Sequence, residues 1–245
     1  MEKVGVYDYH TEVYSLDFRG QLTIPALANY LLHTSTCHAS ERGYGFIDMA
    51  ERDLLWVLSR FVIDISDNKR LSEPIRIYTW VEGIERILTY RCFEITTLDG
   101  ENLGYARSAW AGINRETRRP ASLENLGLSD YVVERPCPIV FDKFDIQIDE
   151  SASPVPYKVK YSDLDINGHL NSIKYMESIL DLFDVAIYRT RSVARFDIIY
   201  QSEGFYGMEL ELHKQQLSED EYVASICKEG KPICRAKIRF RKVDE

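Results

Sequence analysis

Apolar side chains recur at helical spacing in two stretches of the chain, and each set falls on one face of an α-helix. The first set is Ile24, Leu27, Ala28, Leu31 and Leu32. The second set is Leu170, Ile173, Met176, Leu180, Phe183 and Ile187. A wide apolar stripe of this kind is typical of a helix that packs on a sheet. The pattern therefore predicts one long helix in each half of the chain.

Runs rich in β-branched and aromatic residues follow each predicted helix. In the first half the predicted strands are 58–65 and 75–81, with a hairpin over 92–113. In the second half they are 155–161, 193–200 and 207–214, with a hairpin over 222–240. The two hairpins turn at Asp-Gly, a strong signal, and at Glu-Gly, a weaker one. Each half is thus predicted to be an α+β domain, a long helix on a mainly antiparallel sheet.

The two halves also share a short motif. Residues 16–22 (LDFRGQL) and 164–170 (LDINGHL) have leucine, aspartate, glycine and leucine at identical spacing. The same order of motif, helix, strand and hairpin in both halves indicates a duplication, with extra residues near 43–53 in the first copy. The polar, proline-flanked stretch between the copies is typical of a linker. We therefore predict domains over 1–124 and 151–245, joined by a linker over 125–150.

Composition narrows the class of protein. Hydrophobic residues make up 45% of the chain and charged residues 28%, as in an ordinary globular protein. No apolar run is long enough to span a membrane, and the N-terminus has no secretory pattern. Five cysteines without a CxxC pair favour reduced thiols and a cytoplasmic location. The net charge of −9 argues against a dedicated nucleic-acid binder.

The second copy of the motif is rich in polar side chains that can take part in catalysis or ligand binding: Asp163, Asp165, Asn167, His169 and Asn171. The first six positions match a calcium-binding EF-hand loop. The twelfth position, which must be a glutamate, is Lys174, and a strand rather than a helix is predicted before the loop. Calcium is therefore rejected. A zinc site is weakly supported, because His33 and His38 are five residues apart on their helix. No metal or cofactor is expected.

A purely structural interpretation of the motif is that Asp165 or Asn167 caps a helix that starts near His169. The first copy of the motif limits this interpretation. It keeps the aspartate and the glycine but replaces the amide and the imidazole, with Asp17, Arg19, Gly20 and Gln21 at the four positions. Since the turn is expected to form without the amide and the imidazole, a functional role for Asn167 and His169 is favoured.

The stretch SDLDINGHLNSIKYMESIL (162–180) resembles the second-domain motif of the acyl-acyl carrier protein thioesterases, the plant plastid enzymes and their bacterial relatives. Residues 108–120 (SAWAGINRETRRP) and 198–207 (IIYQSEGFYG) resemble two further segments of that family, the second of which bears a catalytic glutamate. The resemblance implies two tandem hot-dog domains, each a long helix packed on a curved antiparallel sheet. It also implies hydrolysis of a thioester.

Four catalytic residues are expected in the second domain: Asp165, Asn167, His169 and Glu203. The resemblance implies Glu203 as the base that deprotonates water. Asp165 would position the other groups or attack directly, and which carboxylate does which stays open. His169 and Asn167 would bind the carbonyl and the water or steer the thiolate. Gly204 stands where many plant members have a cysteine, which disfavours a thiol nucleophile.

The implied partner is an acyl carrier protein that carries a fatty acyl chain. Carrier proteins are acidic, so docking would need a local basic patch. The candidates are Arg115, Arg118, Arg119, Lys158, Lys160 and Lys174. An apolar slot for the acyl chain is implied in the first domain near Trp56 and Trp110, although core packing explains these residues equally well. The alternatives are an acyl-CoA thioesterase and a non-catalytic acyl-binding module; both a monomer and a homodimer stay open.

Overall fold

The structure is a computed structural model of the 245-residue chain that describes residues 2–124, 126–143 and 153–243. The chain divides into two compact units, Met1–Val140 and Phe141–Glu245. The predicted linker over 125–150 lies partly outside the described residues, and residues 126–140 belong to the first unit. Among the described residues, no helix is long and apolar enough to cross a membrane.

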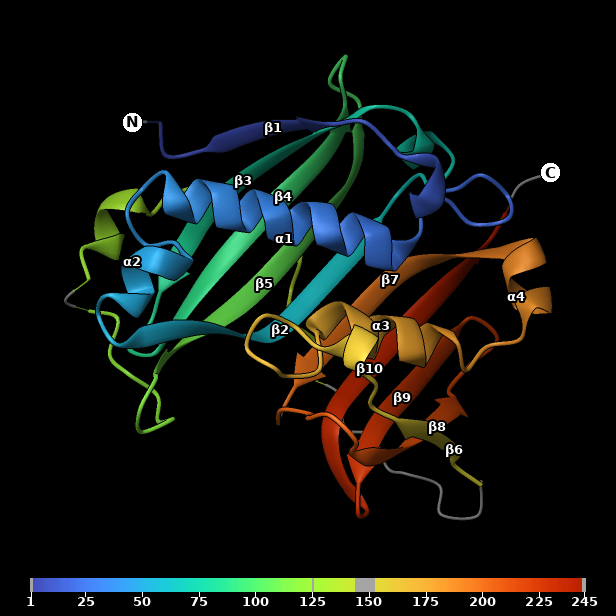
Figure 1. Cartoon of the computed structure of the whole chain (residues 1–245). Coiled ribbons are helices and arrows are strands. Elements are labelled where there is room, and N and C mark those ends of the chain that lie inside the picture. Colours follow the sequence, from blue (N-terminus) through green and yellow to red (C-terminus); the bar gives the residue numbers. More distant parts are fainter. Residues whose placement is uncertain (1, 125, 144–152, 244–245) are drawn as a thin grey trace. The chain divides into compact units, whose positions relative to one another are not determined.

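The first unit is an antiparallel sheet with one long helix across it (Figure 1). Its strands are β1 (Gly5–Tyr9), β2 (Leu54–Ile65), β3 (Ile75–Ile84), β4 (Leu88–Thr97) and β5 (Asn102–Asn114). Its helices are α1 (Ile24–Ser40) and α2 (Phe46–Ala50), with short 3-10 helices η1 (Val13–Ser15), η2 (Arg70–Ser72) and η3 (Leu128–Tyr131). Neighbouring strands follow the order β1-β3-β4-β5-β2. The predicted strands and hairpin of this half are confirmed, whereas β1 and α2 were not predicted.

Helix α1 begins where its sequence allows it to begin. The Thr23 hydroxyl accepts the Ala26 N–H (3.2 Å), and Pro25 lies in the first turn, where its missing N–H has no partner to lose. Leu27 and Leu31 of this helix are fully buried. Burial of two such side chains stabilises the fold by roughly 1.5–3 kcal/mol each. The predicted apolar stripe is therefore the face that packs on the sheet.

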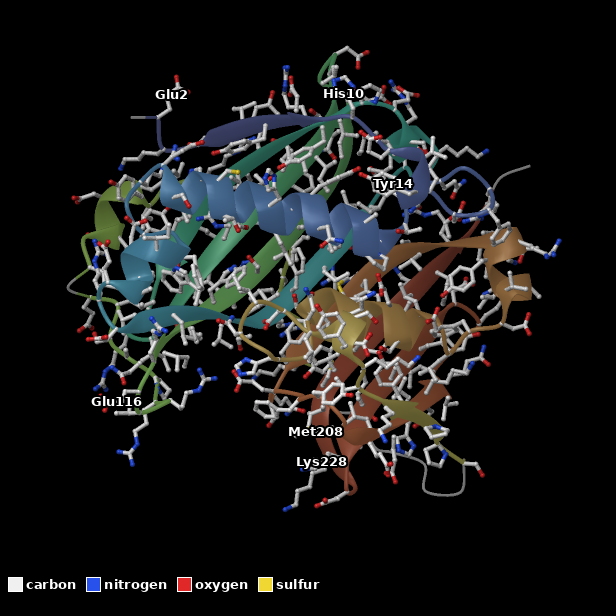
Figure 2. The ribbon with its side chains drawn as sticks, viewed as in Figure 1. Glu2, His10, Tyr14, Glu116, Met208 and Lys228 are labelled. Atoms are coloured by element: carbon white, nitrogen blue, oxygen red, sulfur yellow. The ribbon has the colours of Figure 1, made fainter. Side chains whose placement is uncertain are left out.

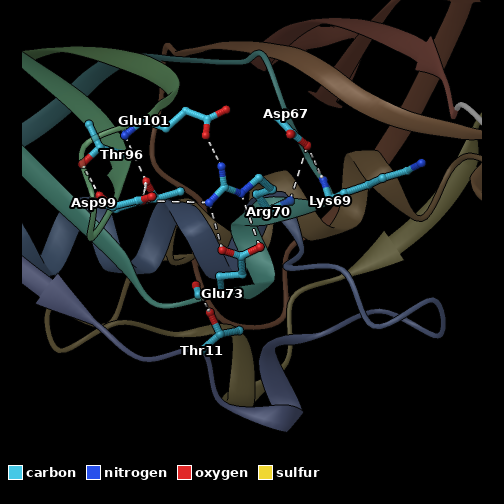
Figure 3. A network of polar contacts seen from close by, with 9 residues as sticks. Thr11, Asp67, Lys69, Arg70, Glu73, Thr96, Asp99 and Glu101 are labelled. Carbon is cyan, nitrogen blue, oxygen red and sulfur yellow. Dashed lines mark hydrogen bonds and ion pairs between the residues drawn. The ribbon is translucent and has the colours of Figure 1, made fainter.

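A surface network of charges joins two connections of the first unit (Figure 3). Arg70, in η2 between β2 and β3, contacts Glu73 (3.3 Å) and Glu101, and lies 3.9 Å from Asp99. Glu101 and Asp99 belong to the β4–β5 turn that the Asp-Gly pair predicted. Because these groups are exposed, the network orients the connections more than it stabilises the fold.

The second unit repeats the arrangement with shorter helices (Figure 1). Its strands are β6 (Val155–Lys158), β7 (Arg191–Tyr200), β8 (Glu209–Gln216), β9 (Glu221–Lys228) and β10 (Lys231–Lys242). Its helices are η4 (Tyr161–Asp163), α3 (Ser172–Leu180) and α4 (Val185–Thr190). Antiparallel neighbours follow the order β7-β10-β9-β8-β6. The β9–β10 turn has positive φ at both Glu229 and Gly230, as a two-residue hairpin requires.

The helix of the second unit is shorter than its apolar periodicity predicts. It ends at Leu180, and α4 starts separately after Asp184, whose side chain accepts a backbone N–H of the new helix (2.7 Å). Phe183 lies in the turn between the two helices, and it is nevertheless buried against Phe240 of β10, with ring centroids 5.1 Å apart. The apolar spacing overestimated the length of the helix, because Phe183 faces the sheet from a turn and so continues the helical pattern of apolar residues.

The first copy of the motif folds into a compact turn before α1. Asp17 Oδ1 accepts the N–H groups of Arg19 (2.8 Å) and Gln21 (2.9 Å). The backbone of Asp17 bonds that of Gln21 (2.8 Å) and of Gly20 (2.9 Å), and Gly20 has a left-handed φ of 72°. Tyr14, labelled in Figure 2, lies exposed on the preceding 3-10 helix. Besides these backbone bonds, Asp17 Oδ2 pairs with the Arg19 guanidinium (3.1 Å).

The second copy forms the same turn 148 positions later, with Asp165 in the place of Asp17. Asp165 Oδ1 accepts the N–H groups of Asn167 (2.8 Å) and His169 (3.0 Å), and Gly168 has a φ of 78°. The helix that follows is capped by Asn171, whose side chain accepts the Ile173 N–H (2.9 Å). The prediction that Asp165 or Asn167 caps the helix was therefore wrong, because Asp165 already holds the turn before the helix.

Candidate active site

The structure brings two of the four predicted site residues into direct contact. His169 lies at the end of the motif turn, and Glu203 lies in the connection between β7 and β8. His169 Nδ1 is 3.3 Å from Glu203 Oε1, within reach of a hydrogen bond or an ion pair. The side chains are 22% and 32% exposed, respectively, so the pair is partly screened from water but reachable by a substrate. A ring N–H of His169 that donates to this carboxylate would orient the carboxylate.

Backbone contacts hold the two loops together. The Leu170 N–H donates to Gly204 O (2.8 Å), and His169 and Phe205 form an antiparallel bridge. The Phe205 ring also meets the His169 ring edge-on, with centroids 5.1 Å apart at 86°. These contacts hold the residues directly after Glu203 against His169 and Leu170.

Gly204 has no space for a side chain. A Cβ atom there would lie 2.9 Å from Leu170 Cβ and 3.2 Å from the Tyr175 hydroxyl. The close approach of the two loops therefore depends on glycine at this position. A cysteine here would have to push the motif turn away from Glu203, which gives a packing reason for its absence from this chain.

Asp165 and Asn167 occupy different places from the His169–Glu203 pair. Asp165 supports the turn through two accepted backbone bonds, one of them from His169 itself. Asn167 is exposed at the tip of the turn, and within the described part of the chain its carboxamide makes no hydrogen bond. Asn167 thus stands two residues before His169 in the chain, with an exposed carboxamide.

Thiol groups near this site are unsuited to nucleophilic attack. All five cysteines are free, and Cys234 of β10 is fully buried opposite Tyr200 of β7. Burial raises the pKa of the Cys234 thiol well above its ordinary value, and burial also raises the pKa of Cys227. Thiols held in the protonated form are poor nucleophiles.

Several other predicted candidates are explained by packing or pairing. Trp56 donates its indole N–H to Tyr44 O (2.9 Å) and packs against a buried apolar cluster, and Trp110 bonds Ser108 (2.9 Å). Of the predicted basic patch, Lys174 pairs with Glu177 (2.6 Å) on its own helix.

The two histidines of α1 also have structural partners. His38 is fully buried and contacts the Arg91 guanidinium (3.0 Å), while His33 contacts Tyr9 (2.9 Å). Among the described residues no group of three or more histidine, cysteine, aspartate or glutamate side chains is arranged to hold a metal ion.

Sequence reasoning missed Tyr175, a buried residue of α3 whose hydroxyl donates to Ser202 O (3.2 Å), next to Glu203. A signal was present in the repeat. The first copy has Leu27 at the equivalent position, 148 residues earlier, so the hydroxyl distinguishes the second copy as the imidazole does.

A helix laid across an antiparallel sheet, present twice in one chain, defines a tandem hot-dog protein. Residues 3–130 match the family described as acyl-ACP thioesterase N-terminal domain, and residues 146–242 match the acyl-ACP thioesterase C-terminal domain. Together these matches cover most of the sequence. The chain therefore belongs to the acyl-ACP thioesterase family.

Solved structures agree with this assignment. An acyl-ACP thioesterase from Bacteroides thetaiotaomicron superposes with a TM-score of 0.89 at 38% identity, covering 98% of each chain. A 12:0-ACP thioesterase from Umbellularia californica superposes with a TM-score of 0.88 over 99% of both chains. Its identity of 18% supports the fold alone.

Curated relatives include plant plastid enzymes. An acyl-acyl-carrier-protein hydrolase of Cuphea viscosissima is 26% identical over 215 residues, which span 82% of this chain and 51% of the relative. An oleoyl-acyl carrier protein thioesterase of Arabidopsis thaliana is 27% identical over 210 residues, spanning 78% of this chain and 57% of the relative. The chain thus spans only about half the length of the curated relatives it matches.

Proposed function

We propose that this protein hydrolyses the thioester between a fatty acyl group and an acyl carrier protein and releases a free fatty acid. The observation that carries the proposal is the contact between Glu203 and His169, a histidine on a turn that the first copy forms with glutamine in its place. The first copy keeps the same backbone bonds with Arg19 and Gln21, so the imidazole and the amide serve something other than the fold. Membership of the acyl-ACP thioesterase family supports the substrate class.

In the proposed reaction, the Glu203–His169 pair removes a proton from a water molecule as the water oxygen attacks the thioester carbonyl carbon. Glu203 is the base, and His169 orients it and the water. The carbonyl oxygen becomes an oxyanion, which the carboxamide of Asn167 stabilises by donating a hydrogen bond. Collapse of the tetrahedral intermediate breaks the carbon–sulfur bond. The departing thiolate takes up the proton from the pair, so acid, thiol and free enzyme result.

Asp165 has a supporting part in this proposal. Its Oδ1 already accepts two backbone N–H groups, at 2.8 and 3.0 Å, and one of them belongs to His169. A carboxylate committed to these bonds is a weaker nucleophile than one that faces the substrate. The equivalent Asp17 makes the same bonds in the copy that lacks the imidazole. We therefore assign Asp165 to the positioning of His169 and leave the attack to water.

The test replaces the pair with residues that keep the turn. His169→Gln installs the residue that the first copy carries on the same backbone, and Glu203→Gln removes only the charge. Each is expected to lower kcat by about 100-fold or more, the range that a general base contributes. Glu221→Gln is the matched control, because Glu221 lies in the same unit, is similarly exposed (34%) and pairs with Lys237.

Release of the carrier thiol from acyl-acyl carrier protein is measured with a thiol reagent, in parallel with the same acyl group on coenzyme A. A larger kcat/KM for the coenzyme A thioester would replace the carrier-protein proposal by an acyl-CoA thioesterase. Hydrolysis at the wild-type rate by Glu203→Gln would remove this carboxylate from the mechanism. Tight acyl binding without turnover in the wild type would favour the non-catalytic module.

A further inference from the structure

Tyr175 contacts the loop that carries Glu203 from the interior of the second unit. Its side chain is buried, with the residue 3% exposed, and it projects from α3 toward the loop that carries the glutamate. The hydroxyl donates to Ser202 O (3.2 Å) and lies 3.2 Å from where a Cβ of Gly204 would stand. These are the residues immediately before and after Glu203. One hydroxyl thus bonds the backbone before the glutamate and packs against the residue after it.

The hydroxyl is not required for packing a hot-dog helix. At the equivalent position in the first unit, Leu27 is completely buried on α1 without any polar atom. The second copy instead buries a phenol whose oxygen needs hydrogen-bond partners. Leucine in one copy and tyrosine in the other parallels glutamine and histidine at positions 21 and 169. The hydroxyl and the imidazole therefore occur together in the same copy.

Tyr175 is itself held in a defined place and in a defined protonation state. Its ring packs edge-on against Tyr200, with centroids 5.5 Å apart at 83°, and the Tyr200 hydroxyl donates to Ser172 O at the start of α3 (3.0 Å). Burial is the main cause of the raised pKa of Tyr175, so the phenol keeps its proton. It can therefore always donate to Ser202 O.

We propose that Tyr175 is a positioning residue for thioester hydrolysis: its hydroxyl bonds Ser202 O, packs against Gly204 and so keeps the Glu203 carboxylate against His169. This inference rests on the proposed function of the His169–Glu203 pair. It explains why the glutamate can act from an irregular connection rather than from a strand, since a loop needs extra bonds to hold a side chain in place.

The test is Tyr175→Phe, which keeps the ring and removes only the hydroxyl. Because a displacement of about 1 Å in an active site costs up to roughly 100-fold in rate, kcat is expected to fall by about 10- to 100-fold while KM stays close to that of the wild type. Tyr188→Phe is the matched control, since Tyr188 also lies in the second unit and its hydroxyl donates to Leu180 O (2.7 Å), away from the loop. Equal losses in the two variants would overturn the proposal.

A double-mutant cycle separates positioning from a general structural role. If Tyr175 acts through Glu203, Tyr175→Phe has no further effect on kcat in the Glu203→Gln background. Multiplied losses would overturn the inference and leave the proposed function intact, whereas wild-type turnover by Glu203→Gln alone would defeat the proposed function. Amide exchange gives a readout apart from activity: the Leu170 N–H, which donates to Gly204 O across the two loops (2.8 Å), is expected to exchange faster in Tyr175→Phe. Unchanged exchange would contradict the positioning role.

Discussion

The role of Asp165 can be decided by a pair of equivalent substitutions, Asp17→Asn and Asp165→Asn. Asparagine keeps an Oδ1 that can accept the same two N–H bonds, and it removes only the charge. Each aspartate accepts two backbone bonds of 2.8–3.0 Å in its turn. Bonds to a charged acceptor contribute about 1.5–3 kcal/mol and bonds to a neutral one about 0.5–1.5 kcal/mol.

The expected loss of stability follows from this difference. Two bonds weakened by about 1 kcal/mol each give about 2 kcal/mol, and partial exposure to water reduces this to about 1–2 kcal/mol for each turn. Asp17→Asn also loses the ion pair with Arg19 (3.1 Å), whose side chain is 18% exposed. The loss of this ion pair adds about 0.5 kcal/mol. Urea unfolding of both variants beside the wild type measures these losses.

Activity then separates support from chemistry. Asp17→Asn is expected to leave kcat unchanged, because its turn carries neither the imidazole nor the amide. Asp165→Asn is expected to lower kcat less than about 10-fold, through a looser His169. A loss of about 1,000-fold or more in Asp165→Asn, with a stability loss equal to that of Asp17→Asn, would refute the assignment and make Asp165 a nucleophile or a base.

Two further predictions concern stability. Burial, together with the charges of Arg91 and Arg42, lowers the pKa of His38 to about 3 from 6.5, so only the unfolded chain takes up this proton as the pH falls below 6.5. The unfolding free energy is expected to fall as the pH drops below 6.5, with a slope that approaches about 1.4 kcal/mol per pH unit near pH 5; urea unfolding of His38→Gln should lack this slope, and equal slopes would contradict it. Gly204→Ala is expected to lose about 1–3 kcal/mol and most activity, because its Cβ would meet Leu170 at 2.9 Å. Gly83→Ala, with open space around it, is the control, and equal thermal shifts in both would disprove the packing argument.

Features that depend on residues close together in the chain were predictable from the sequence. The hairpin turns, the strands and the start of α1 follow from alternation and from capping between residues a few positions apart. The motif turn closes within five residues, between Asp165 and His169, so comparison of the two copies was enough to predict that the turn forms without the imidazole. Both copies form these local hydrogen bonds, because both have the aspartate and the glycine at the same spacing.

The tertiary structure decided the rest, because its contacts join residues far apart in the chain. Glu203 lies 34 positions from His169, and Leu170, Gly204 and Tyr175 bring the two within 3.3 Å. The resemblance to a family had suggested Glu203, but periodicity and spacing alone would have made it an exposed turn residue. The early end of α3 at Leu180 was likewise decided by where Phe183 meets the sheet. A sequence pattern records that a residue is apolar or polar, whereas the folded chain determines which distant group it touches.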